Sequence, residues 1–214
     1  MDKSKLELFL ETTPDINKPK EHLEQYSTPS TIASKVLWEA YMHGDIVDKT
    51  IGDFGCGSLR LALGALHLGA RRAVGVEIDC STLSNSKEAL AKREERWRTL
   101  LVCSDVRSIV LTNVDTIVMN PPFGVKKQNR GLDMAFLKKA LETANNVYTM
   151  HKHSSGEEVL VKTICEGAGF KVVYVDKALF PIKMTYRHHR RKVYRVAVDI
   201  YGLRRATASE ELTS

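Results

Sequence analysis

Between residues 46 and 119, short apolar runs alternate with longer segments of helical periodicity. Four apolar or β-branched runs predict strands: 46–53, 72–78, 99–104 and 114–119. Two helical patterns lie between these runs, at 59–69 and 80–96. Strands that are joined through helices run parallel and are covered by those helices. The alternation therefore predicts an α/β fold built on a parallel sheet.

The rest of the chain adds helices and strands to this alternating core. Three strand candidates, at 170–176, 178–184 and 193–201, would bring the mostly parallel sheet to seven strands. Further helices are expected in an amphipathic segment around Leu6 and Leu10, behind Thr28 as N-cap with Pro29 in the first turn, along the stripe of Met134, Leu137 and Leu141, and behind Ser154 or Ser155.

The length of 214 residues leaves room for one full α/β domain and not for two. Hydrophobic residues make up 43% of the chain and charged residues 27%, values typical of a folded globular protein rather than a disordered one. We expect an N-terminal extension over 1–28, the main domain over 29–205 and a flexible tail over 206–214.

Neither a membrane span nor a secretion signal is expected, because no run approaches the roughly 18 uncharged residues of a membrane helix. The four cysteines are Cys56, Cys80, Cys103 and Cys165, and they form no CxxC motif or Cys/His cluster of zinc-ligand spacing. This pattern predicts four free thiols, no bound metal and a reducing, intracellular location.

Glycines mark the point where the first predicted strand gives way to a helix, in Asp53-Phe54-Gly55-Cys56-Gly57. Glycine lets the backbone approach a bound ligand closely. Glu77 and Asp79 follow the second predicted strand, where a carboxylate can accept both hydroxyl protons of a ribose. Together these features predict a nucleoside site, the alternative being a tight turn and a helix cap. Leu59 replaces the third glycine of a dinucleotide motif, so NAD is not expected.

The tetrapeptide Asn120-Pro121-Pro122-Phe123 directly follows the fourth predicted strand. Its prolines end the strand and stiffen the loop. The Asn120 amide oxygen and the Pro121 carbonyl can then accept both hydrogens of an exocyclic amino group, and Phe123 can stack on a planar ring. This arrangement would favour attack by adenine N6 on a sulfonium methyl group, through orientation and electrostatics. A proline-stiffened loop without chemical function is the alternative.

The chain carries a formal charge of +6, and its basic residues gather in two segments. Such clusters, interleaved with aromatic residues, suit phosphates and stacked bases, whereas a solvated loop is their ordinary alternative. The segments flank the expected carboxyl edge of the sheet. The candidate RNA contacts are Lys126, Lys127, Arg130, Lys183, Arg187, Arg190, Arg191 and Lys192.

The combined motifs resemble a known family. Asp53, Gly55, Gly57, Glu77-Ile78-Asp79, Asp105 and Asn120-Pro121-Pro122-Phe123 resemble class I S-adenosylmethionine-dependent amino-methyltransferases, whose fold is Rossmann-like. More narrowly, three segments resemble the eukaryotic small-subunit (18S) ribosomal RNA adenosine N6-methyltransferases: Leu23-Glu24-Gln25-Tyr26-x-Thr28-Pro29, Gly124-x-Lys126 and Gly131-x-Asp133-Met134-Ala135-Phe136-Leu137. The likeness runs from about residue 5 to residue 201.

The resemblance implies S-adenosylmethionine as cofactor and a role for each matching residue. Asp53, Gly55 and Gly57 would hold the methionine part, Glu77 the ribose, and Ile78 and Asp105 the adenine. The extension 1–28 would contribute Gln25 and Thr28 to this site. The implied cofactor contacts are Gln25, Thr28, Asp53, Gly55, Cys56, Gly57, Glu77, Ile78, Asp105, Val106 and Asn120, and the implied catalytic residues are Asn120, Pro121, Pro122 and Phe123.

The resemblance also implies a partner, a small zinc-binding activator protein that adds a strand to the edge of the sheet. Strand 99–104 is expected at that edge, where a bare apolar strand invites pairing. The substrate would be 18S ribosomal RNA, in the nucleus, the nucleolus or the cytoplasm. Two other functions stay open: an N5 methyltransferase of a protein glutamine amide, and an inactive RNA-binding subunit of the same fold, suggested by Leu59.

Overall fold

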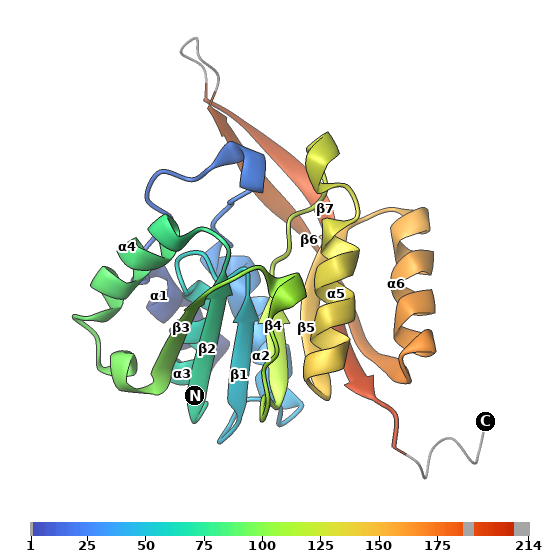
Figure 1. Ribbon diagram of the computed structural model, residues 1–214, viewed down its shortest axis with the longest axis horizontal. Helices are drawn as coiled ribbons and strands as arrows, with labels where there is room; N and C mark the ends of the chain where they lie inside the picture. Colours follow the sequence, from blue (N-terminus) through green and yellow to red (C-terminus); the bar gives the residue numbers. More distant parts are fainter. Residues whose placement is uncertain (1, 186–190, 208–214) are drawn as a thin grey trace.

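The predicted strands assemble into one seven-stranded sheet in the computed structural model, which describes residues 2–185 and 191–207 (Figure 1). The strand order is β3-β2-β1-β4-β5-β7-β6. Strands β1 to β5 pair in parallel, and β7 runs antiparallel to both β5 and β6. The bounds are β1 (Thr50–Phe54), β2 (Arg72–Glu77), β3 (Thr99–Cys103), β4 (Thr116–Met119), β5 (Asn146–Lys152), β6 (Phe170–Thr185) and β7 (Arg191–Arg205).

Helices cover both faces of the sheet, each over its own buried apolar cluster. One cluster joins one face of the sheet to α1 (Lys3–Glu11), α2 (Ser30–Met42), α3 (Arg60–His67) and α4 (Cys80–Leu90). The other joins the opposite face to α5 (Leu132–Thr143) and α6 (Ser155–Gly167). Short 3-10 turns complete the pattern: η1 (Glu21–Leu23), η2 (Glu94–Arg98), η3 (Val106–Ser108) and η4 (Lys127–Asn129). This is the expected class I methyltransferase fold.

The structure corrects the predicted elements in three places. Strand β5 was not expected, because Thr149 and His151 interrupt its apolar run; both are buried, as parallel strands are when both faces are covered. The candidates 170–176 and 178–184 form the single strand β6 at the sheet edge, along which exposed residues such as Val175 and Leu179 alternate with less exposed ones. The N-cap of α2 is Pro29 without a side-chain cap, and Thr28 points elsewhere.

The prediction of four free thiols is also wrong. Cys80 and Cys103 form a disulfide with a Cα–Cα separation of 5.3 Å, and Cys56 and Cys165 are free and buried. The parallel register places Cys103 opposite Glu77, so the end of β3 lies beside the start of α4. Spacing along the chain does not reveal this proximity, since it arises from pairing between β2 and β3.

The edges of the sheet differ. As expected, β3 is an edge strand, and the other edge is β6, whose hairpin with β7 extends well past the remaining strands (Figure 1). Among the described residues no helix is long and apolar enough to cross a bilayer. In the same residues, no three His, Cys, Asp or Glu side chains are grouped to hold a metal ion.

Candidate active site at the carboxyl edge of the sheet

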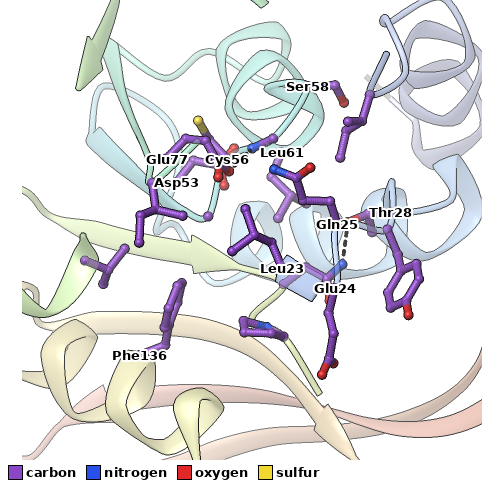
Figure 2. A pocket seen from close by; sticks show the side chains of 18 of the residues that line it. Leu23, Glu24, Gln25, Thr28, Asp53, Cys56, Ser58, Leu61, Glu77 and Phe136 are labelled. Atoms are coloured by element: carbon purple, nitrogen blue, oxygen red, sulfur yellow. Dashed lines mark hydrogen bonds between the residues drawn. The ribbon is translucent and has the colours of Figure 1, made fainter. Parts of the chain in front are cut away.

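A cavity of about 120 Å³ lies over the carboxyl ends of β1, β2 and β4 (Figure 2). Its floor is the loop after β1, with the ends of β2 and β4 on either side. Its outer wall is the segment 12–29 between α1 and α2, which we call the strap. Helix α5 closes the remaining side through Phe136. Ligands of open α/β sheets bind at this position, beyond the strand ends.

The loop after β1 has left-handed backbone conformations at Gly55 (φ +69°) and Gly57 (φ +48°). A Cβ atom at Gly55 would lie 3.3 Å from the Phe136 ring, and one at Gly57 would lie 3.0 Å from Ile16. Leu59 follows with φ of 68° at the N-cap of α3, a conformation that disfavours a side chain. Because Leu59 is 1% exposed, burial of its side chain offsets part of that strain.

Two buried carboxylates face the cavity from the ends of β1 and β2. Asp53 Oδ2 accepts a hydrogen bond from the Ala62 N–H, and burial raises the pKa of Asp53 to about 7. Glu77 accepts from the N–H groups of Gly57 and Asp79, and burial raises its pKa as well. Burial raises the pKa of both acids, so a ligand that brings positive charge and hydroxyl donors would favour their ionised forms.

Asp79 caps helix α4, which was the alternative interpretation for both Glu77 and Asp79. It accepts from the Ser81 N–H at the start of α4 and from Lys20 Nζ at 2.7 Å. Burial acts to raise the pKa of Asp79, but hydrogen bonds from Lys20, Ser81 and Thr82 outweigh it and hold the pKa well below its ordinary value. Glu77 is therefore the acid that remains for a ribose.

Asp105 lies at the rim of the cavity with an ion partner that was not predicted. The guanidinium of Arg107 binds both carboxylate oxygens, with Nη2 2.5 Å from Oδ2. This hydrogen bonding lowers the pKa of Asp105 and keeps it an acceptor. Ile78 is 52% exposed nearby and offers an apolar face for a base.

The tetrapeptide after β4 places one unpaired acceptor at the cavity. Asn120 Nδ2 donates to Thr28 Oγ1 at 3.0 Å, whereas Asn120 Oδ1 is buried and has no partner among the described residues. Pro122 lines the cavity beside it. Pro121 and Phe123 are not among the lining residues: Phe123 is 5% exposed and packs edge-on against Phe180, with ring centroids 5.2 Å apart.

The strap is tied to both sides of the cavity. Arg60 on α3 donates to the carbonyl oxygen of Thr28 and pairs with Asp15 at 2.9 Å. Gln25 Nε2 donates to Asp79 at the start of α4. On the opposite side, Glu21 pairs with Lys126 at 2.5 Å. The strap therefore joins α3 and α4 to the loop behind the tetrapeptide.

All the predicted cofactor contacts lie around this one cavity. They share positions at strand ends or in the strap: Gln25, Thr28, Asp53, Gly55, Cys56, Gly57, Glu77, Ile78, Asp105, Val106 and Asn120. Sequence reasoning missed several lining residues. Glu24 and Phe136 lie in motifs but were assigned no role at the cavity, and four others carry no motif: Ile16, Arg60, Arg107 and Asn129. Phe136 is buried beside the core stripe of α5 and also lines the cavity.

The predicted RNA contacts are described only in part. Lys127 and Arg130 are exposed on the loop beside the cavity, and Lys126 is engaged with Glu21. Arg187 and Arg190 lie outside the described residues, as do the side chains of Lys183, Arg191 and Lys192.

A glycine loop, buried carboxylates at consecutive strand ends and an unpaired amide oxygen after β4 together define a class I methyltransferase, with S-adenosylmethionine as methyl donor. The donor set fits that cofactor, which carries an ammonium group, a sulfonium centre and ribose hydroxyls. The family model for the methyltransferase small domain matches residues 30–174, so the chain belongs to this family.

Relatives of similar length support this assignment. The chain is 34% identical to the rRNA N(6)-adenosine-methyltransferase Mettl5 of Drosophila melanogaster, over 92% of this chain and 93% of the relative. It is 32% identical to an uncharacterized protein of Methanocaldococcus jannaschii, over 94% and 93%. The crystal structure of a candidate RNA methyltransferase from Pyrococcus horikoshii superposes with a TM-score of 0.86 at 33% identity, covering 97% of this chain and 99% of that one.

Proposed function

We propose that the protein transfers a methyl group from S-adenosylmethionine to N6 of an adenosine in 18S small-subunit ribosomal RNA. The observation that carries the proposal is the buried, unpaired Oδ1 of Asn120 at the cavity. An unpaired buried acceptor is unfavourable unless a ligand donates to it, and an exocyclic amino group is such a donor. The name of the Drosophila relative supports this substrate class.

The chemistry follows from the lone pair of adenine N6, which is delocalised into the ring. Asn120 Oδ1 would accept one N6 hydrogen, which orients the lone pair toward the methyl group. Acceptance of the second hydrogen by the Pro121 carbonyl requires that Pro121, which does not line the cavity here, turn toward it. The Asn120–Thr28 hydrogen bond holds the amide in this orientation before substrate arrives. In the proposed transfer the N6–methyl bond would form as the methyl–sulfur bond breaks, the bonding pair would stay on sulfur, and N6 would lose one proton to solvent.

RNA would approach over the basic loop behind the tetrapeptide. Lys127 and Arg130 are exposed there, with no acidic partner among the described residues. The basic segment of the β6–β7 hairpin would bind the other side of the RNA. Since the cavity is walled by the strap and α5, the target base must be unpaired or flipped to enter it. Stacking by Phe123 requires that its ring leave the contact with Phe180.

The edge strand β3 supports a partner as part of the same proposal. Leu100 is 60% exposed on β3, and Trp97 is 80% exposed just before it. A groove between α4 and β3 runs along the same surface. A small zinc-binding activator protein that adds a strand here would cover this apolar edge. The location we propose is intracellular, in the nucleus, the nucleolus or the cytoplasm, where ribosomal RNA is found.

Methyl transfer with labelled cofactor tests the proposal. The complex with its activator is incubated with ribosomal RNA and, separately, with ribosomal proteins, and modified nucleosides are identified by mass spectrometry. We expect label in N6-methyladenosine of 18S RNA. Label only in protein glutamine would contradict the RNA substrate and support the glutamine-amide alternative.

Calorimetry with S-adenosylmethionine tests the other alternative, an inactive subunit. Leu59 already adopts the left-handed conformation that a glycine would have at that position, so the loop geometry is kept. We expect clear cofactor binding by the complex. No detectable heat at millimolar cofactor would contradict a catalytic role.

A further inference from the structure

The carboxyl group of Glu24 is fixed where the strap meets the loop behind the tetrapeptide. Glu24 has a left-handed backbone conformation with φ of 53° and is 5% exposed. Its Oε1 accepts from the backbone N–H of Lys126 at 2.8 Å and from Asn129 Nδ2 at 3.0 Å. In Figure 2 it lies with Thr28 and Gln25, across the cavity from Asp53 and Glu77. Its hydrogen bonds to Lys126 and Asn129 join Glu24 to the loop behind the tetrapeptide, over which the RNA is proposed to approach.

The second carboxyl oxygen of Glu24 is a buried acceptor without a partner. Glu24 Oε2 and Asn120 Oδ1 are the two side-chain atoms in this state among the described residues, and both residues line the same cavity. A buried acceptor that stays unpaired is unfavourable, more so when it carries charge. Two such atoms around one cavity indicate a ligand that donates a hydrogen bond to each.

The donors of an adenosine within an RNA chain are few. The N6 amine has two hydrogens, and the proposed function, on which this inference rests, assigns them to Asn120 and the Pro121 carbonyl. The remaining strong donor is the ribose 2′-hydroxyl, the group that distinguishes RNA from DNA. A carboxylate only accepts hydrogen bonds, so it binds a hydroxyl and repels a phosphate.

The residues that hold the Glu24 side chain, Lys126 and Asn129, are consistent with a ribose beside Glu24 Oε2. Lys126 and Asn129 belong to the loop that also carries the exposed Lys127 and Arg130, where phosphates would bind. A ribose lies between its base and its phosphates, hence between Asn120 and this loop. We propose that Glu24 Oε2 accepts a hydrogen bond from the 2′-hydroxyl of the target adenosine and so selects RNA over DNA.

A single-atom change in the substrate tests this proposal. The complex methylates an RNA oligonucleotide that contains the adenosine identified by the transfer experiment, and a second oligonucleotide with 2′-deoxyadenosine at that position only. We expect kcat/KM to fall about 10- to 100-fold on the deoxy substrate, as for loss of a hydrogen bond to a charged group. In Glu24→Ala the ratio between the two substrates should fall to within about twofold.

A second variant and a matched control separate substrate recognition from folding. Glu24→Gln keeps an acceptor for Lys126 and Asn129, so it should bind S-adenosylmethionine like the wild type. Its kcat/KM should fall less than that of the wild type when the target is 2′-deoxyadenosine; we call this fall the deoxy penalty. Glu21→Gln removes a strap acid that is 66% exposed at its side chain and should retain the full penalty.

Each outcome decides the assignment. Equal wild-type rates on the two substrates, an unchanged penalty in both Glu24 variants, or a penalty only when a neighbouring nucleotide is deoxy would overturn it. Absence of transfer to the all-ribose RNA would overturn the proposed function and this inference together.

Discussion

At the scale of single residues, side chains of the same type take different roles in the site because their surroundings differ. Asp53 and Asp79 are both buried aspartates, but the pKa of Asp53 is raised by burial and that of Asp79 is lowered by its donors. The sequence predicts that acids follow β1 and β2. It does not predict which acid caps a helix, because that depends on a strap almost 60 residues away in the chain.

Asn120→Ala should reduce methyl transfer by about a hundredfold or more, because the substitution removes a positioned acceptor from the transition state. Cofactor affinity should stay nearly unchanged, since Asn120 acts on the amine. Single-turnover rates and calorimetry on the same preparation measure the two effects. Turnover equal to that of the wild type would remove Asn120 from its assigned role.

Cofactor affinity should rise with pH through the pKa of Asp53, about 7 in the apo protein. Binding of a cationic methionine group favours the ionised carboxylate, so binding releases a proton below this pH. Calorimetry between pH 6 and 8 should show tighter binding at the higher pH, and Asp53→Asn should bind weakly with a flatter profile. A wild-type affinity independent of pH would contradict this prediction.

The raised pKa of Asp53 also makes the folding stability of the protein depend on pH. The folded pKa of Asp53 lies above its ordinary value of 3.8, so the folded state holds this proton more tightly than the unfolded state. This contribution is fully present below the unfolded pKa, is lost as pH rises toward 7, and is constant above. Compared with Asp53→Asn, the wild type should lose stability over that window.

At the scale of elements, strands with a simple apolar pattern were predictable and strands defined by their neighbours were not. β1 to β4 and both major helical layers follow from periodicity. β5 carries polar residues that are satisfied only in the fold: Thr149 contacts His151, and His151 contacts Asp133 on α5. Similarly, the joining of α4 to β3 through Cys80 and Cys103 follows from strand order, which the sequence does not contain.

The Cys80–Cys103 disulfide should stabilise the α4–β3 unit. It closes a loop with a sequence separation of 23 residues, so its reduction should lower the free energy of unfolding by about 3 kcal/mol. Denaturant unfolding with and without reductant measures this difference. The double variant Cys80→Ser, Cys103→Ser should be insensitive to reductant. Titration of four thiols in unreduced, denatured protein would contradict the pairing.

At the scale of the whole molecule, the chain places its chemical site and its exposed apolar edge on different parts of one sheet. The cavity lies over the carboxyl strand ends, whereas the exposed side chains of Trp97 on η2 and Leu100 on β3 lie at the edge of the sheet. Periodicity predicts that β3 exists, and the parallel order β3-β2-β1-β4 places it outermost. A partner at β3 would therefore stabilise the domain while leaving the RNA side open.

Expressed alone, the chain should be poorly soluble, and Leu100→Lys with Trp97→Lys should increase its solubility. Both side chains are mostly exposed, so the substitutions should change the free energy of unfolding by only about 0.5 kcal/mol.

The same two substitutions should abolish copurification of the activator protein, because charges on an edge strand oppose the addition of another strand. Leu179→Lys is the matched control: Leu179 is 62% exposed on β6, the opposite edge, and its substitution should leave copurification intact. A wild-type chain that behaves as a soluble monomer, or a β3 variant that still binds the activator, would show that the edge is not the docking surface.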